Sequence, residues 1–83
     1  MDEIHFPLYR RTENGLNWYR VESITEFTEV QKVGSRYVSH RVKAFIYPEK
    51  VRVMELIAAE GGHVVNCEAE AFETRLSQCH ASE

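Results

Sequence analysis

The sequence predicts an α+β fold, a two-layer sandwich in which a sheet of about four strands carries three helices mainly on one face. Three observations lead to this prediction. A turn signal lies between two segments rich in aromatic and β-branched residues, a later segment alternates with the two-residue period of a strand, and several segments have apolar residues at helical spacing. The elements follow in the order β-β-α-β-α-β-α. We expect residues 1–83 to form a single domain with a frayed tail at 80–83.

The first two strands are predicted from the pair Asn14-Gly15, which favours a two-residue type I′ turn. The segments FPLYRRT and LNWYRVE flank it. This turn sets a register in which the paired residues are Glu13 and Leu16, Arg11 and Trp18, Tyr9 and Arg20, and Leu8 and Val21. The hairpin therefore collects Tyr9, Arg11, Trp18 and Arg20 on one face and Leu8, Tyr19 and Val21 on the other.

The segment 23–33, SITEFTEVQKV, can be interpreted as a helix or as a strand. Ser23 and Glu26 match a capping box, and Ile24, Phe27 and Val30 follow at three-residue spacing. As a strand the segment would place Phe27 with Glu29, Gln31 and Val33 on one face, so strict alternation fails. We favour the helix and leave the strand open.

The pattern of residues in the second half of the chain predicts two more strands and two helices. Val38, His40, Val42, Ala44 and Ile46 alternate as one face of a strand. Pro48 suits the first turn of a helix that ends at Gly61-Gly62. HVVN, at 63–66, is a short strand, and a last helix begins at Asn66 or Cys67. Its apolar stripe consists of Ala69, Phe72, Leu76 and Cys79.

Composition limits the classes of function. The formal net charge of −3 makes a general nucleic-acid binder an unfavourable interpretation. We expect a soluble cytoplasmic protein, because no apolar run reaches the length of a membrane span and the N-terminal residues lack the order of a signal peptide. No cofactor motif is present. The sequence therefore predicts neither a cofactor nor a membrane partner.

The two cysteines are predicted to be reduced. If residues 68–79 are helical, Cys67 and Cys79 lie roughly 18 Å apart, whereas a disulfide needs Cα atoms within about 7 Å. The same separation argues against a zinc site formed by His63, Cys67, Cys79 and His80. A nucleophilic Cys67 at a helix N-terminus is opposed by Glu68 and Glu70.

His40 is the one candidate for acid or base chemistry. In a row of apolar residues it could be a neutral base or a metal ligand. The alternative is a buried structural imidazole that bonds a carbonyl or an acid such as Glu22. We favour the structural interpretation, because the sequence identifies no nucleophile or second acid beside His40.

The distribution of charge predicts a binding face. Basic residues gather on predicted strands and acidic ones on predicted helices, so the side of the sheet without helices should carry aromatic and basic groups. These candidate binding residues are Tyr9, Arg11, Trp18, Arg20, Tyr37, Arg41 and Lys43. Tyrosine, tryptophan and arginine are enriched at interaction surfaces. Equally, Arg11 with Trp18 and Tyr9 with Arg20 could be cation–π pairs that only stabilise an exposed sheet.

We therefore expect a small interaction module, without enzymatic activity, that binds a protein partner, a second copy of itself or an anionic ligand through this face. Trp18 is expected to point away from the helices into solvent. The alternatives are a small enzyme with His40 as general acid or base, and a weak binder of single-stranded nucleic acid through Trp18, Tyr9 and Tyr37.

Several segments of the chain together resemble a family of small, uncharacterised bacterial α+β proteins. They are Trp18-Tyr19, SITEFTEVQ, GSRYVSH and YPE, which cover roughly the middle half of the chain. The resemblance implies no activity and assigns no site residue.

Overall fold

The computed structural model describes residues 4–59 and 64–79 and shows an antiparallel five-stranded sheet with two helices. The strands lie in the order β4-β3-β2-β1-β5. In chain order the elements are β1 (Leu8–Thr12), β2 (Asn17–Ser23), β3 (Glu26–Val33), β4 (Arg36–Lys43), α1 (Tyr47–Ala58), β5 (Val64–Asn66) and α2 (Ala69–Ser77). The α+β class is confirmed. The predicted numbers, about four strands and three helices, differ from the five strands and two helices of the described residues.

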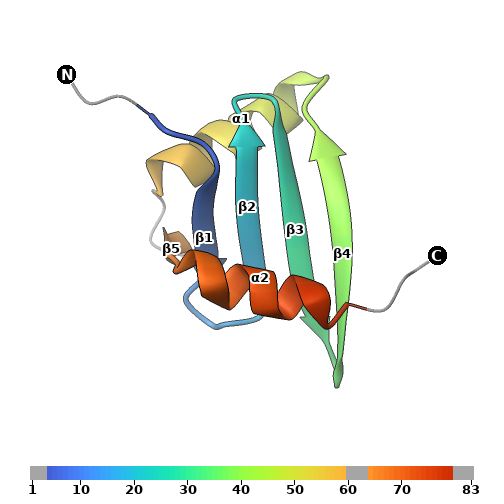
Figure 1. Cartoon of the computed structure of the whole chain (residues 1–83). Helices are drawn as coiled ribbons and strands as arrows, with labels where there is room; N and C mark the ends of the chain where they lie inside the picture. The colour runs from blue at the N-terminus through green and yellow to red at the C-terminus, as the bar shows by residue number, and fades with distance from the viewer. Residues whose placement is uncertain (1–3, 60–63, 80–83) are drawn as a thin grey trace.

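The two helices lie on opposite faces of the sheet, so the predicted arrangement with helices mainly on one face is wrong (Figure 1). Helix α1 begins beside the end of β4 and reaches β1, where Arg10 bonds the carbonyl oxygens of Leu56 and Ile57. Helix α2 begins beside β1, where the Cys67 N–H donates to the Tyr9 carbonyl, and crosses the other face toward β4. The molecule thus has three layers: helix, sheet and helix.

The segment predicted as a helix at 23–33 is instead the last residue of β2, the β2–β3 turn and the strand β3, which pairs with β2 on one side and β4 on the other. The physical reason is that both faces of the sheet are covered. Phe27 is buried toward α1, and Val30 is buried toward α2. A strand with two buried faces does not alternate between apolar and polar residues, so its pattern looks irregular.

The hairpin of β1 and β2 has the predicted register. Arg11 pairs with Trp18, Tyr9 with Arg20, and Leu8 with Val21. The connection is wider than a two-residue turn, because the Gly15 N–H donates to the Thr12 carbonyl at 3.0 Å and the pairing ends at Arg11 and Trp18. Gly15 has φ of 74°, in the left-handed region that glycine adopts readily.

The core consists of one cluster on each face of the sheet. The cluster under α1 contains Tyr19, Val21, Phe27, Ala44, Val53 and Leu56. The cluster under α2 contains Trp18, Val30 and Phe72, with Tyr9, Tyr37, Cys67, Leu76 and Cys79 packed around it. Each helix therefore depends on the sheet for the burial of its apolar side, as most short helices do.

The predicted helix beginning near Pro48 and the predicted strand before the last helix are both present, as α1 and β5. The predicted helix end at Gly61-Gly62, His63 of the short strand and the tail at 80–83 lie outside the described residues. In the described part of the chain, neither helix is long and apolar enough to cross a membrane.

Candidate functional site

The predicted binding face is the face that α2 covers. Trp18 is only 5% exposed, so the prediction that it points away from the helices into solvent is wrong. The hairpin register correctly places Tyr9, Arg11, Trp18 and Arg20 on one face, but that face carries its own helix. Of the predicted aromatic residues, Trp18 is therefore buried, while Tyr9 and Tyr37 are partly buried beside it.

Two of the predicted binding residues anchor α2 to the sheet. The Tyr9 hydroxyl donates to a Glu73 oxygen at 3.0 Å, and Arg20 bonds the same oxygen at 2.8 Å. Arg20 also pairs with Glu22 at 2.6 Å and lies over the Phe72 ring. Burial, followed by the hydrogen bond to Glu73, raises the pKa of Tyr9. These groups are occupied by contacts within the protein.

Trp18 is in contact with one side chain from strand β4 and one from helix α2. Tyr37 meets the indole edge to face, with 5.9 Å between ring centroids. The guanidinium carbon of Arg75 lies 4.6 Å from the indole centroid, which is a favourable cation–π geometry. Arg75 belongs to α2, so this contact also holds the helix on the sheet.

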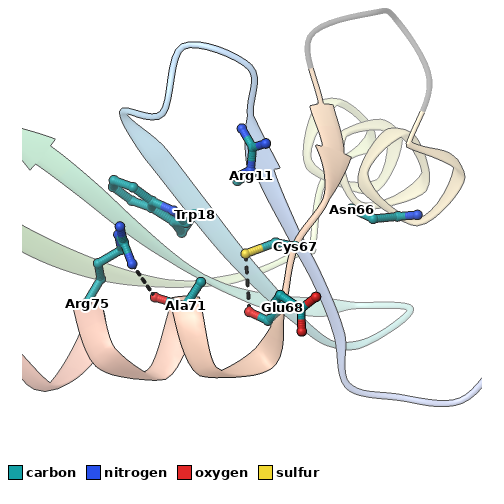
Figure 2. Close-up of a pocket in the computed structure, with 7 residues that line it drawn as sticks. All are labelled: Arg11, Trp18, Asn66, Cys67, Glu68, Ala71 and Arg75. Carbon is teal, nitrogen blue, oxygen red and sulfur yellow. Dashed lines mark hydrogen bonds between the residues drawn. The ribbon is translucent and has the colours of Figure 1, made fainter.

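A groove opens between the start of α2 and the strands β1, β2 and β5 (Figure 2). Its volume is about 440 Å³, and its walls are Arg11, Trp18, Asn66, Cys67, Glu68, Ala71 and Arg75. Two of the seven lining residues are arginines. The groove therefore combines positive charge with a partly apolar floor.

The two arginines of the groove have no carboxylate partner in the described part of the chain. Arg11 donates to the Thr12 carbonyl at 3.2 Å, and Arg75 donates to the Ala71 carbonyl at 3.0 Å. The Nε of Arg75 is buried and makes no hydrogen bond. Each guanidinium has five N–H donors, so both keep most of their capacity to bind an anion.

The Cys67 thiol lies in the same groove and donates to the Glu68 carbonyl at 3.3 Å. Burial raises the pKa of Cys67, against the smaller opposite effect of Arg11 and Arg75. The thiol is therefore protonated at neutral pH, which does not suit a nucleophile. Both cysteines are free, as predicted. Among the described residues no cluster of metal ligands is present, while His63 and His80 fall outside them.

His40 is exposed, so the prediction that it is buried in the core is wrong. It lies on β4 opposite Glu29 and on the same side as Val42. Val42 packs against the core under α1, but α1 covers only one end of that face, and His40 lies two residues farther from it. Neither of the two grooves that we describe is lined by His40.

Arg41 and Lys43 lie near the other edge of the sheet, away from the groove of Arg11 and Arg75. Arg41 pairs with Glu26 at 3.1 Å, and Lys43 lines a second groove at the end of β4. The seven predicted residues are thus divided among the α2 contact, the first groove and β4. Sequence reasoning missed Arg75. Its position three residues after Phe72 on the apolar stripe was the signal that could have identified it.

The chain matches no family model, no curated protein and no solved structure. The family resemblance therefore stays a prediction.

Proposed function

We propose that the protein is a small binding domain that holds the carboxylate or phosphate group of an anionic ligand in the groove between Arg11 and Arg75. The observation that carries this proposal is that two arginines, neither of them in an ion pair within the described residues, line the same groove. The chain has 13 acidic residues against 10 basic ones, so acidic partners for these arginines were plentiful.

The chemistry of the lining favours an anion. The planar fork of a guanidinium matches the two oxygens of a carboxylate or phosphate. The groove also lies at the amino end of α2, whose N-cap residue, Glu68, makes no side-chain cap. The amino end of the helix dipole adds positive potential there. Glu68 also lines the groove and lowers its net positive charge.

The other functions receive less support from the same residues. An enzyme would need His40 in a pocket, whereas His40 is exposed on β4. Stacking of single-stranded nucleic acid would need open aromatic faces, whereas Trp18 is buried between Tyr37 and Arg75. Two free thiols accord with a reducing compartment, and we include a cytoplasmic location in the proposal.

The test uses Trp18, the only tryptophan, as a reporter in contact with Arg75. Sodium phosphate and sodium citrate are titrated at constant ionic strength, with sodium chloride as the reference salt. We expect a saturable change in tryptophan emission with at least one of the two anions and none with chloride.

Arg11→Gln and Arg75→Gln should each reduce the affinity, and Arg75→Lys should not restore it, because lysine lacks the fork. Arg36→Gln is the matched control, since it removes the same charge at an exposed site next to the β3–β4 turn. Equal titration curves for wild type and Arg11→Gln, or an equal response to chloride, would contradict the proposal.

A further inference from the structure

Strand β4 is an edge strand of the sheet, and alternate backbone groups along it have no strand partner among residues 4–59 and 64–79. The Ala44 N–H donates to the Thr25 carbonyl at 2.7 Å, which fixes the alternation of hydrogen bonds between β3 and β4. Arg36, Val38, His40 and Val42 therefore bond β3. Tyr37, Ser39, Arg41 and Lys43 direct their N–H and C=O groups outward.

This edge lacks most of the devices that usually block an exposed strand. β4 has eight residues, all paired with β3 in one continuous register without a bulge. It contains no proline, and α1 and α2 cross the faces of the sheet without running along the outer side of β4 (Figure 1). The opposite edge strand, β5, has only three residues. Long regular edges pair readily with another strand.

The charge of β4 determines which strand could pair with it. Its sequence, RYVSHRVK, contains Arg36, Arg41 and Lys43 and no acid. Arg41 is paired with Glu26, while Arg36 and Lys43 form no ion pair with the described residues. In a dimer formed by two β4 strands, cations would face cations, which is unfavourable. An acidic strand would instead be attracted.

A second groove extends this edge beyond the carboxyl end of β4. Its volume is about 420 Å³, and it is lined by Thr25, Glu26, Lys43, Ala44, Phe45 and Lys50. Phe45, two residues after the strand, is 77% exposed. Two lysines and an open aromatic ring here suit a segment that carries both a carboxylate and apolar side chains.

We propose that β4 takes up an extended acidic segment of a partner protein as a sixth strand, with a carboxylate of that segment held between Lys43 and Lys50. The main-chain bonds would involve Tyr37, Ser39, Arg41 and Lys43. This surface lies at the opposite edge of the sheet from the groove of Arg11 and Arg75, so either proposal can fail without the other.

The test uses a synthetic probe, the blocked hexapeptide Glu-Val-Glu-Val-Glu-Val, with Lys-Val-Lys-Val-Lys-Val as its control. Amide hydrogen exchange of the protein is measured by NMR with and without peptide. We expect the acidic peptide to slow exchange at Tyr37, Ser39, Arg41 and Lys43. The Val38 and Val42 amides already donate to β3 and should change much less. The basic peptide should have no effect.

Lys43→Gln and Arg36→Gln should weaken binding of the acidic peptide several-fold. Arg11→Gln removes the same charge from the other groove and should leave the affinity unchanged. Binding without protection of the four outward amides would overturn the proposal. Protection of those amides in the free protein, together with a doubled mass in solution, would also overturn it, because a second copy would then occupy the edge.

Discussion

At the scale of single residues, Trp18 links the groove to the stability of the fold. Its indole lies under α2 between Tyr37 and Arg75 and is 5% exposed. We predict blue-shifted emission that iodide quenches poorly. Trp18→Ala should destabilise the protein by roughly 3–5 kcal/mol, as for other large-to-small core changes. Red-shifted, readily quenched emission from the folded protein would contradict the burial of this side chain.

Arg10 stabilises the end of α1 from the neighbouring sheet. Its Nε and Nη2 donate to the carbonyl oxygens of Leu56 and Ile57 at 2.8 and 3.0 Å, at the negative end of the helix dipole. Arg10→Met keeps much of the apolar stem but removes both bonds, so we predict a loss of about 1–3 kcal/mol in the free energy of unfolding.

The control for this change is Arg36→Met, at an exposed position outside any ion pair that the described residues form, which should cost less than about 0.5 kcal/mol. Urea unfolding curves for the two variants give the comparison. Equal midpoints and slopes for both variants would show that the helix end does not depend on Arg10.

At the scale of elements, the hairpin was predictable and β3 was not. The β1–β2 register depends on local turn chemistry around Asn14 and Gly15, which the sequence displays directly. The assignment of β3 depends on what covers each face of the sheet. Val30 is buried by α2, an element that begins some forty residues later, and Phe27 is buried by α1. Tertiary contacts of this kind decide between helix and strand where a short pattern is ambiguous.

The β3–β4 turn depends on Gly34. Its φ is 64°, and an added Cβ would meet no atom within 4 Å, so a substitution is opposed by backbone strain alone. We predict that Gly34→Ala destabilises the protein by about 1–2 kcal/mol. Gly34→Asn should cost less, because asparagine tolerates the left-handed region. Thermal unfolding of both variants tests this order, and an alanine variant as stable as wild type would contradict it.

At the scale of the whole molecule, the placement of the two helices determined which part of the candidate site could be predicted. Arg11 and Trp18 were found from the sequence because they share one face of a local hairpin. The groove forms only because α2 crosses that face. The helix contributes Arg75, and the segment before the helix contributes Cys67. The side of the sheet that a helix covers depends on the path of the chain between elements, which leaves no local pattern in the sequence.

This three-layer packing also determines the response of the protein to alkaline pH. Burial raises the pKa values of Cys67 and Cys79 above the ordinary 9.0 of a thiol and those of Tyr9 and Tyr19 above the ordinary 10.0 of a phenol. Each group holds its proton more tightly when folded than when unfolded. Between the two pKa values the folded state therefore binds more protons, and stability falls as pH rises.

We predict that the free energy of unfolding is unaffected by these groups below about pH 9, the unfolded pKa of the thiols, and decreases from there upward through the folded pKa values of the tyrosines. Urea unfolding at a series of pH values measures this dependence.

The double change Cys67→Ala and Cys79→Ala should lower stability at neutral pH by opening core volume, yet delay the alkaline decrease until the tyrosines ionise, near pH 10.0 or above. A free energy that rises above pH 9.0, or an onset unchanged in the double variant, would mean that the thiols are not desolvated by the α2 layer.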